Sequence, residues 1–448
     1  MGDYVEDDRT NGESHPAAMN GNADRKPVLI VGAGLAGLLL AQALRRDGIP
    51  FRVFERDADF TTRGVGWGLT LNWCLPTLRT LLPKELSATD TFRNAYVDRA
   101  AVEAGEISKF PFFDLDTGEM KASTPPAPET SRIRVTRERL RKLLATDINV
   151  EFNKPFVSLE DHGDSITATF EDGTAVEGCL VIGSDGGKSR VRNHVFPQES
   201  KDLMRTLPIR MLGFKAEYTP EEVAPIRKYD TYFLQGSAAS TAAFGYLSFL
   251  DAPDNVGNNT GKYACQIILS WPYRAGFFGN AEPLDVPPTN EERYQLFKDV
   301  TKNWAEPFKT LVDGVTRDIE FKEVKLQDWA PSRGLRSNGR AVVMGDAMHL
   351  MTMYRGEGAN HALVDPEDFV NHVLPVLKTN PDDTAALREA LSQYEAAVVL
   401  RTRPCVLASR QASLDAHCPE RIAATSPLLS RRQMFVEFAD DSQDAGLV

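Results

Sequence analysis

The amino-acid sequence predicts an α/β protein that consists of a Rossmann-like dinucleotide-binding domain, a β-sheet domain inserted into it, and a helical C-terminal region. Three observations support this fold class. A short apolar run at 28–31 leads into a glycine-rich turn at 32–37 and then a helical stretch, which is the start of a βαβ unit. A β-rich middle, from about 205 to 275, interrupts the pattern. A further buried-type strand at 341–344 precedes a remainder that is mostly helical.

The length of the chain sets the domain organisation. Its 448 residues fit two to three domains at ~150 residues each, and no linker rich in glycine, serine or proline separates them. We therefore expect the dinucleotide-binding domain to span 26–204 and to continue, with the C-terminal helices, over 331–437. The inserted β-rich domain is expected at 205–330. We expect 1–25 to be a disordered tail, because it holds almost no large aliphatic residues, and 438–448 to be a second tail.

Composition excludes several classes of protein. Lys and Arg total 51 against 63 Asp and Glu, a net charge of −12 that argues against non-specific nucleic-acid binding. Five scattered cysteines show no CxxC pair and no zinc spacing, so we expect reduced thiols, a cytoplasmic location and no metal site. The longest apolar run, 28–44, reaches only the lower limit for a membrane span and contains three glycines within six residues, at 32–37. A strand, a turn and a helix explain it better, so stable membrane insertion is not expected.

The first motif is GAGLAG at 32–37. Gly32, Gly34 and Gly37 allow a tight strand-to-helix turn, close approach of a pyrophosphate and close packing of the helix on the strand. The helix N-terminus then favours the phosphate charge. Glu55 ends the next strand, 23 positions after Gly32, where a carboxylate accepts hydrogen bonds from ribose hydroxyls. Because it would repel a 2′-phosphate, the predicted nucleotide is FAD or NAD, not NADP.

Two more glycine-rich segments follow buried strands. GSDGGKSRVR lies at 183–192, and GDAMH at 345–349 is followed by RGEGAN at 355–360, which opens a helix. The N-terminus of that helix could stabilise a developing negative charge. Taken alone, each segment is equally consistent with an ordinary glycine-rich turn.

Together, in this order and spacing, the three motifs resemble the FAD-binding fingerprints of the group A flavoprotein monooxygenases, the enzymes similar to para-hydroxybenzoate hydroxylase. VTRERLRKLL at 135–144 and GVGWGLTLNW at 64–73 are also similar to segments that line the flavin in that family. The resemblance covers roughly residues 27–415. It implies an FAD-binding domain of the GR2 type that carries an inserted substrate domain. The loop sequences look most like fungal-type members of secondary metabolism.

The resemblance also implies which residues contact FAD. Gly32, Gly34 and Gly37 would contact the pyrophosphate, and Glu55 would bind the adenosine ribose. Gly68 would lie in the loop and strand that line the flavin, Arg137 would contact the cofactor, and Asp185 would belong to a motif that serves both FAD and NAD(P)H. Asp346 would bind the ribityl or pyrophosphate region, and the isoalloxazine would lie over Gly356, Gly358 and Ala359. The sequence departs from the family pattern at Met353, where many members have Pro, and mildly at Ser184 and Gly187.

The implied reaction is a monooxygenation. The chain holds no second GxGxxG motif, so NADPH or NADH would bind transiently to reduce FAD. Reduced flavin would form a C4a-hydroperoxide with O2 and pass one oxygen atom to an aromatic or alkene small molecule, by hydroxylation or epoxidation. Arg210 and Tyr232 are the candidate catalytic residues, the first for a phenolate or carboxylate and the second for proton exchange with a phenol. A surface salt bridge and a half-buried strand aromatic are their alternative interpretations.

Other functions remain open on sequence grounds. A flavin-dependent oxidase or a Baeyer–Villiger-type oxygenase would share the same cofactor motifs. The Trp-x-Trp-x-Ile-Pro signature of flavin halogenases is absent from the sequence. A non-catalytic flavin- or nucleotide-binding protein would hold FAD without consuming NAD(P)H, and an NAD-dependent dehydrogenase would bind no flavin.

Overall fold

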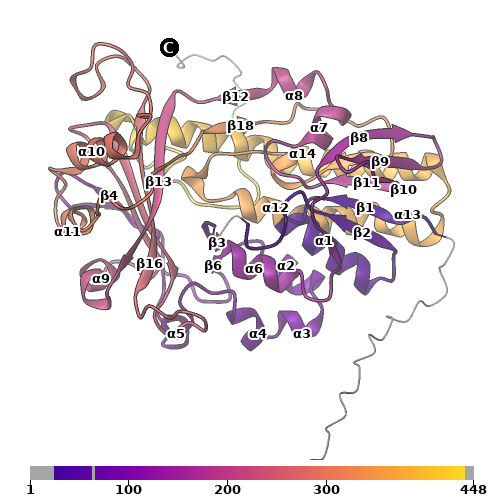
Figure 1. Ribbon diagram of the computed structural model, residues 1–448, viewed down its shortest axis with the longest axis horizontal. Helices are drawn as coiled ribbons and strands as arrows, with labels where there is room; N and C mark the ends of the chain where they lie inside the picture. The colour runs from indigo at the N-terminus through magenta and orange to yellow at the C-terminus, as the bar shows by residue number, and fades with distance from the viewer. Residues whose placement is uncertain (1–24, 63–65, 439–448) are drawn as a thin grey trace, which may run out of the picture.

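The computed structural model describes residues 25–62 and 66–438, so the predicted tails lie almost entirely outside the described residues. Figure 1 shows two parts side by side: a large sheet with small helices on the left, and a layered α/β part on the right. The long helix α14 (Thr384–Asp415) runs along the back of both.

A five-stranded parallel sheet forms the centre of the right-hand part. Its strand order is β19-β11-β1-β2-β7. The strands are β1 (Val28–Val31), β2 (Phe51–Phe54), β7 (Val150–Glu151), β11 (Leu180–Gly183) and β19 (Ala341–Val343). Residues of β1, β11 and β19 are buried throughout, as expected for a parallel sheet covered on both faces. Helix α1 (Leu35–Arg46) follows β1 directly and packs against α12 (Gly358–His372), so the predicted strand–turn–helix unit is confirmed.

Smaller elements surround this sheet. An antiparallel sheet holds β8 (Phe156–Asp161), β9 (Ile166–Phe170) and β10 (Ala175–Gly178), and β3 (Gly68–Leu71) pairs with β6 (Ile133–Thr136). The helices of this part are α2 (Leu75–Leu81), α3 (Lys84–Ser87), α4 (Thr89–Arg93), α5 (Arg99–Glu103), α6 (Arg137–Leu144), α7 (Arg190–Val195), α8 (Glu199–Asp202) and α13 (Leu374–Thr379). The described residues also form four short 3-10 helices, η1 (Phe277–Gly279), η2 (Gly345–Ala347), η3 (Met353–Arg355) and η4 (Pro419–Arg421).

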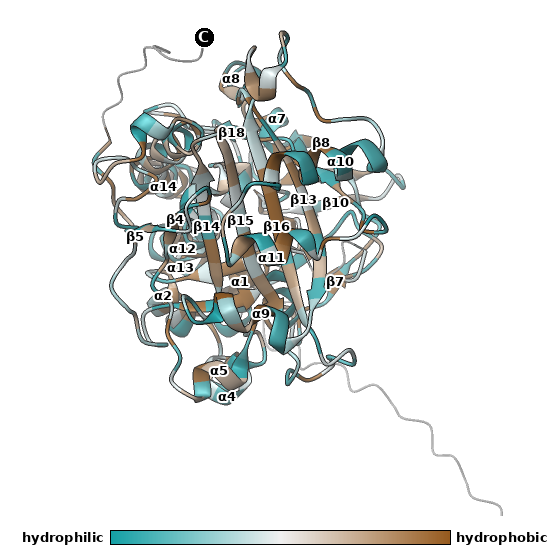
Figure 2. Cartoon of the chain, turned by 90° about the vertical axis from the view of Figure 1, so that its left-hand side faces the viewer, coloured by the Kyte–Doolittle hydropathy of each residue, from teal (hydrophilic) through white to brown (hydrophobic). Residues whose placement is uncertain are grey.

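The left-hand part is a seven-stranded sheet in the order β17-β13-β16-β15-β14-β4-β5. Its strands are β4 (Phe112–Asp114), β5 (Met120–Ala122), β13 (Ile209–Tyr218), β14 (Phe233–Ala238), β15 (Ala243–Asp251), β16 (Tyr263–Pro272) and β17 (Lys322–Glu323). Figure 2 shows its outer face, over which lie α9 (Pro220–Arg227), α10 (Asn290–Thr301) and α11 (Phe308–Asp313). Side chains alternate along a strand, so the sheet has a second face. Side chains on that face line a cavity together with residues of the FAD-motif loops.

A two-stranded ribbon lies where the chain enters the inserted segment and where it leaves it. Strand β12 (Met204–Thr206) pairs antiparallel with β18 (Gln327–Trp329), and these positions adjoin the ends expected for the inserted domain. Strands β4 and β5 differ from the expectation, since they come from within 26–204 and yet extend the seven-stranded sheet. Strand β4 pairs with β14, which lies more than 100 residues away and is beyond the reach of a local sequence pattern, and β5 pairs with β4.

The helical C-terminal region agrees with the prediction and closes the fold behind α12. Among residues 25–62 and 66–438, no helix combines the length with the apolar character that crossing a bilayer requires.

Candidate active site

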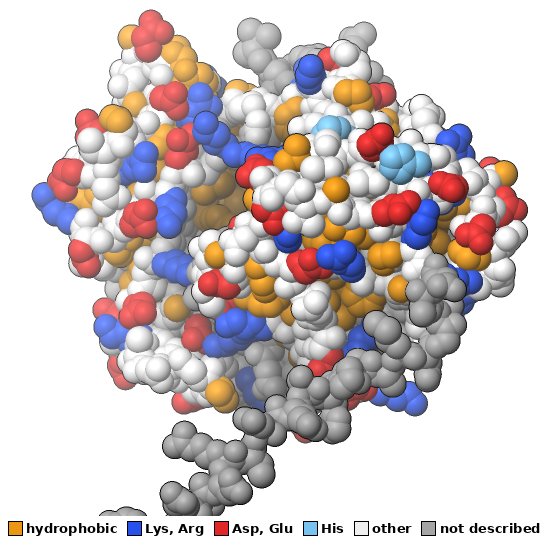
Figure 3. Space-filling model, turned by 45° about the vertical axis from the view of Figure 1, so that its right-hand side comes forward, with side chains coloured by type: hydrophobic (Ala, Val, Ile, Leu, Met, Phe, Trp, Pro, Cys, Tyr) orange, Lys and Arg blue, Asp and Glu red, His pale blue; other side chains and the backbone are white. Residues whose placement is uncertain are grey.

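A cavity of about 510 Å³ lies between the carboxyl ends of the parallel strands and the inner face of the seven-stranded sheet. Its walls include the glycine-rich turn after β1, the loop after β11, the loop between β19 and α12, and side chains of β14, β15 and β16. Figure 3 shows one face of the molecule, where a hollow with hydrophobic side chains on its floor separates the left-hand part from the rest. Ligands of open α/β sheets bind at this edge, beyond the strand ends.

The turn after β1 needs glycine for two physical reasons. Gly32 has φ +111°, a conformation that side-chain-bearing residues rarely adopt, and a Cβ there would lie 2.4 Å from the carbonyl oxygen of Ser184. A Cβ on Gly37 would lie 2.3 Å from the carbonyl oxygen of Gly32. The Ser184 hydroxyl, in turn, donates a hydrogen bond to that Gly32 carbonyl at 2.7 Å. The chain thus leaves the N-terminus of α1, at Gly34, open toward the cavity.

Glu55 lies at the end of β2, lines the cavity and is largely buried. Its Oε2 accepts hydrogen bonds from the backbone N–H of Ala33 at 3.1 Å and from the guanidinium of Arg141 at 2.8 Å. Arg141 also donates to the carbonyl oxygen of Ala33 at 2.6 Å, so it locks the glycine-rich turn to the carboxylate. The sequence prediction included Glu55 and missed Arg141. The signal was present, because Arg141 lies one helical turn after Arg137 on α6.

Asp185 follows β11 and lines the rim of the cavity. Its carboxylate accepts from the hydroxyl of Ser189 at 2.5 Å and from the backbone N–H of Arg190 at 2.7 Å, and so holds the first turn of α7. Burial raises the pKa of this carboxyl, although these hydrogen bonds act in the opposite direction. Asp185 therefore organises its own loop, which is a structural task additional to the predicted contact with nucleotides.

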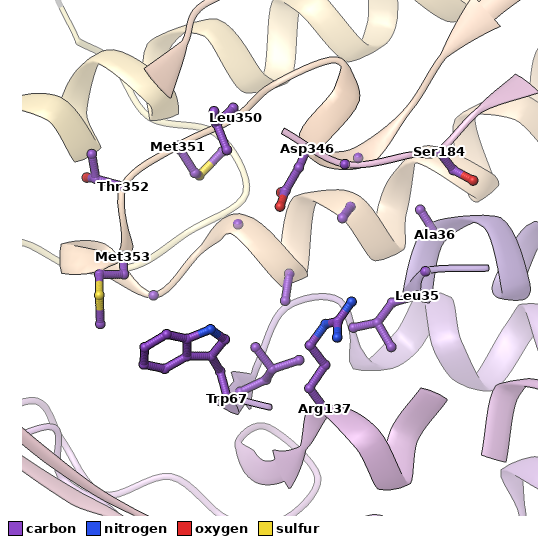
Figure 4. Close-up of a pocket in the computed structure, with 18 of the residues that line it drawn as sticks. Leu35, Ala36, Trp67, Arg137, Ser184, Asp346, Leu350, Met351, Thr352 and Met353 are labelled. Carbon is purple, nitrogen blue, oxygen red and sulfur yellow. The ribbon is translucent and has the colours of Figure 1, made fainter. Parts of the chain in front are cut away.

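Asp346 and Arg137 project into the same space from opposite walls, as Figure 4 shows. Arg137 is the first residue of α6, and its backbone N–H donates to the carbonyl oxygen of Trp67 at 3.0 Å. Asp346 is exposed to the cavity, yet the surrounding atoms desolvate it and raise its pKa, while the charges of His349 and Arg137 oppose this rise. A carboxylate and a guanidinium thus lie on opposite sides of the same pocket, and both belong to segments that resemble the FAD motifs.

The loop from 353 to 359 brings the third motif to the cavity. Gly356 is left-handed, with φ +66°, and Gly356, Gly358 and Ala359 all line the cavity at the N-terminus of α12. Arg355 and Glu357 form a fully buried ion pair with an Nε–Oε2 distance of 2.7 Å. The C-terminal segment fastens this pair, since the backbone N–H of Gln433 donates to Glu357 at 3.1 Å. The sequence did not indicate that Arg355 and Glu357 pair with each other.

A buried polar network supports the loop after β19 from behind. One oxygen of Asp365 accepts from the backbone N–H of Gly345 at 2.6 Å and contacts Nε2 of His349 at 2.8 Å. The other accepts from Arg401 at 2.7 Å. These contacts hold the pKa of Asp365 well below its usual range, against the effect of burial. The network fixes the backbone that carries Asp346.

The inner face of the seven-stranded sheet forms the opposite wall. Alternation along the strands places Phe233 and Gln235 of β14, Tyr246 of β15 and Gln266 of β16 at the cavity. Arg134 of β6 lies behind Tyr246 and is also a lining residue. A Cβ on Gly68 would lie 2.5 Å from an Nη of Arg134, so this glycine makes room for the guanidinium. Gln235, Tyr246, Gln266 and Arg134 were not singled out from the sequence, whereas Phe233 was expected in the core or the pocket lining.

The two predicted catalytic residues are not part of the cavity wall. Arg210 shares its strand face with Leu212 and Phe214, which pack in the outer core, and its Nε donates to Asp285 at 2.6 Å. Tyr232 lies one position before Phe233 and is buried, and burial raises the pKa of its hydroxyl. Tyr232 precedes the first residue of β14, Phe233, which does line the cavity, whereas no residue of β13 is among the lining residues. The salt-bridge interpretation describes Arg210.

Comparisons with known proteins agree with this geometry. A family described as FAD binding domain matches residues 25–247. A probable FAD-dependent monooxygenase of Arthroderma benhamiae is 40% identical over 421 residues, which cover 91% of this chain and 96% of the relative. The chain belongs to the FAD-dependent monooxygenase family. The family member dbaB of Emericella nidulans is 35% identical and covers 81% of this chain and 90% of its own length.

Solved structures show that the fold is shared across this enzyme family. The 2,6-dihydroxypyridine-3-hydroxylase of Arthrobacter nicotinovorans matches with a TM-score of 0.68 at 18% identity, over 93% of this chain and 99% of that one. The Klebsiella pneumoniae protein HpxO, solved with FAD and uric acid, matches with a TM-score of 0.63 at 20% identity, over 88% and 89% of the two chains. The α/β fold class with its FAD-binding domain is therefore confirmed.

The residues present fit an FAD molecule. A Cβ on Gly32 or Gly37 would clash with the backbone of Ser184 or Gly32, so these glycines allow the turn to be tight. Gly32 and Gly34 of this turn line the cavity without a side chain, which suits close approach of a pyrophosphate. The N-termini of α1 and α12 both face the cavity, and their N–H groups favour anionic oxygens. Glu55 and Asp346 supply acceptors for hydroxyl groups at two separate points along the wall. These features match the polar ends of a dinucleotide.

Proposed function

We propose that this enzyme inserts one oxygen atom of O2 into an aromatic or alkene small molecule, by hydroxylation or epoxidation, with NADPH or NADH as the reductant. The observation that carries the proposal is a single cavity that joins the three FAD-motif loops to the apolar and aromatic inner face of the substrate sheet. A substrate lying on that face would be next to the flavin loop at 353–359. The fungal origin of the relatives supports a role in secondary metabolism.

The cofactor-binding roles follow from the site geometry. Gly32, Gly34 and Gly37 would admit the pyrophosphate at the N-terminus of α1, and Glu55 would accept from the adenosine ribose. Asp346 would accept from the ribityl chain, opposite the cation of Arg137. Bound FAD would supply electron transfer from the nicotinamide to O2 and delivery of one oxygen atom.

The third motif would act on the flavin ring itself. Gly358 and Ala359 begin α12, so their backbone N–H groups would face the ring and stabilise negative charge on it. Gly356, in its left-handed conformation, would let the loop pass closely beneath the ring. Asp185 would keep the rim loop ordered where a nicotinamide cofactor approaches.

The protein would also keep water away from the reacting atoms. Trp67, Phe110 and Phe233 line the cavity with aromatic surface, and Met353 lies above Trp67 in Figure 4. A dry wall favours transfer of oxygen to the substrate over loss as hydrogen peroxide. Met353 occupies the position where many relatives carry Pro, so we expect the shape of this wall to be specific to this enzyme.

The test is to purify the protein, load it with FAD and follow oxidation of NADPH and of NADH with a panel of phenols and alkenes under ¹⁸O2. The proposal predicts a substrate-dependent rise in NAD(P)H oxidation and a product that carries one ¹⁸O atom. Substrate-independent oxidation with stoichiometric hydrogen peroxide would instead indicate an oxidase. A lactone or ester product from a ketone would indicate a Baeyer–Villiger-type enzyme. Bound FAD that no nicotinamide reduces would indicate a binding protein.

A further inference from the structure

The last described part of the chain lies against the flavin loop at 353–359. Residues 422–438 form no helix or strand, so side chains and single backbone groups hold them in place. The hydroxyl of Ser426 donates to Asp415, at the end of α14, with a distance of 2.5 Å. Leu428 is fully buried in an apolar cluster that includes Tyr354 of the flavin loop. We call residues 426–433 the C-terminal clasp.

The C-terminal clasp contacts both members of the buried Arg355–Glu357 ion pair. The guanidinium of Arg355 donates to the carbonyl oxygen of Pro427 and, at 2.7 Å, to the hydroxyl of Ser430. Glu357 accepts from the backbone N–H of Gln433 at 3.1 Å. Because Glu357 directly precedes α12, these contacts fix the backbone from which that helix begins.

The C-terminal clasp also places a cation in the cavity wall. Arg432 lines the cavity, and its Nε donates to the carbonyl oxygen of Arg355 in the flavin loop at 3.4 Å. Its two Nη atoms donate to the carbonyl oxygens of Leu428 and Ser430, each at 2.9 Å. In the described part of the chain its acceptors are thus backbone carbonyls, and it forms no ion pair with a carboxylate.

The charge of Arg432 is only weakly compensated. The charged groups that act on it are Arg355 and Arg132, which repel it, and Glu357, whose charge Arg355 already neutralises. Burial lowers the pKa of Arg432 to about 10, so the side chain stays protonated at neutral pH. The ring of Phe110 lies 5.4 Å from the guanidinium carbon and attracts it weakly. Since an unpaired cation that has lost hydration is unfavourable, a negative charge that forms nearby is stabilised by it.

Reduction of bound FAD would produce such a charge at the flavin loop. A hydride from the nicotinamide carries two electrons and one proton, so the ring gains one negative charge unless it takes a second proton from solvent. The N-terminus of α12, at Gly358, favours that negative charge. Arg432 contacts the same loop and is also positive, so its potential adds to that of the helix.

We propose that the C-terminal clasp is part of the flavin site and that Arg432 stabilises the negative charge of the reduced ring. Arg355 and Glu357 are positioning residues, because they tie the clasp to the flavin loop. The inference rests on the proposed function, in which the ring lies at residues 353–359, and it concerns the cofactor and not the substrate. It assigns a role to a segment that lies outside the three FAD motifs.

The test compares the midpoint reduction potentials of FAD-loaded variants, measured against a reference dye over a range of pH. Arg432→Gln is expected to make two-electron reduction about tenfold less favourable at about pH 8, which corresponds to about 30 mV. Near neutral pH we expect the wild type to take up one proton per two electrons and Arg432→Gln to take up closer to two, because the ring then keeps its charge less readily. Arg432→Lys keeps the cation and is expected to stay close to the wild type.

The matched control is Arg431→Gln. Arg431 carries the same charge one position earlier, but its side chain is exposed and is not among the residues that line the cavity. This variant is expected to leave the potential and the proton uptake unchanged, which separates a local charge from the net charge of the protein. FAD content and thermal melting verify each variant, and Arg432→Met repeats the measurement if Arg432→Gln does not fold.

Each result supports or overturns the proposal. An Arg432→Gln protein that holds FAD and matches the wild type in potential and proton uptake would overturn it, as would an equal change in Arg431→Gln. A wild type that takes up two protons per two electrons at about pH 8 would also overturn it. Loss of FAD from Arg432→Gln and Arg432→Met, restored in Arg432→Lys, would overturn it by assigning the cation to retention of the oxidised cofactor.

Failure of the proposed function is distinguishable from failure of this inference. A potential that responds to Arg432 in an enzyme that incorporates ¹⁸O into no substrate would contradict the monooxygenation alone. An enzyme that incorporates ¹⁸O but whose potential does not respond to Arg432 would contradict the role of the C-terminal clasp alone.

Discussion

The hydroxyl of Ser184 donates a hydrogen bond to the carbonyl oxygen of Gly32, with a donor–acceptor distance of 2.7 Å. The two residues belong to motifs separated by about 150 positions, and the contact places the loop after β11 directly against the glycine-rich turn after β1. A Cβ on Gly32 would lie 2.4 Å from the backbone carbonyl oxygen of Ser184. The two FAD motifs thus form one packed unit.

Gly32→Ala is expected to abolish FAD retention and to lower the free energy of unfolding by about 2 to 3 kcal/mol, because both the positive φ and the backbone clash oppose a methyl group. Flavin absorbance per chain and chemical denaturation measure the two effects. Gly173→Ala is the matched control, since Gly173 has φ +81° but no atom within 4 Å of an added Cβ. It is expected to cost about 1 kcal/mol and to retain FAD. Equal FAD loss in both variants would contradict the packing argument.

Asp346→Ala is expected to yield protein that purifies without FAD, since the substitution removes the acceptor that faces Arg137 across the cavity. Fluorescence titration of the apoprotein with FAD measures the affinity, and a loss of about 100-fold or more is expected if the lost hydrogen bonds involve a charged acceptor. Asp285→Ala, on the outer face where Asp285 pairs with Arg210, serves as the control and retains FAD. Tightly held FAD in the Asp346→Ala variant would remove this residue from the cofactor site.

Arg210→Gln and Tyr232→Phe are each expected to leave turnover within about twofold of the wild type. Arg210 points to the outer face of the sheet and Tyr232 is buried outside the cavity, so neither touches a bound substrate. Steady-state NAD(P)H oxidation with an accepted substrate measures the effect. A drop of 100-fold or more in either folded variant would restore the original catalytic assignment.

Glu395 predicts a specific pH dependence of stability. Burial raises the pKa of this carboxyl to about 7 from 4.5, while its hydrogen bonds from the backbone of Ser337 oppose the rise. Between these pH values the folded chain keeps a proton that the unfolded chain releases. The contribution of Glu395 to stability is therefore fully present below pH 4.5 and is lost as the pH rises through about 7.

Glu395→Gln removes the titrating group, so the variant should not share this loss of stability. The free energy of unfolding of the variant minus that of the wild type is expected to increase by about 2 to 3 kcal/mol from pH 5 to pH 8. Denaturant unfolding at several pH values measures the difference. Glu389→Gln, which changes an exposed carboxylate on the same helix, should show no such trend. A flat difference for Glu395→Gln would mean that the carboxyl is ionised in the folded protein.

Local patterns predicted the elements that carry FAD. The strand at 28–31, the glycine-rich turn and the helix that follows are adjacent in sequence, so one short segment holds all the information that the unit needs. The same is true of Asp346 and Gly358, which directly follow a strand and open a helix. These residues lie at the cavity because the fold places the carboxyl ends of parallel strands at one edge.

The substrate wall could not be predicted in this way. In β14, Phe233 and Gln235 lie at the cavity while Leu234 packs in the outer core, so a shift of one position changes the face, and the register depends in part on β4, which is distant in sequence. Arg134 was missed because its apolar neighbours Ile133 and Val135 indicate only a buried strand. Its hydroxyl partners on β15 lie 112 and 114 residues away. The hydrogen bonds of that cation to hydroxyl groups appear only in three dimensions.

The visible spectrum of the purified protein, recorded before and after addition of NADPH under air, tests the central claim most directly. The account predicts flavin bands at a stoichiometry near one FAD per chain, which bleach on reduction and return as O2 reacts. A colourless protein that FAD does not reconstitute would contradict the assignment of the cavity to FAD and, with it, the proposed monooxygenation.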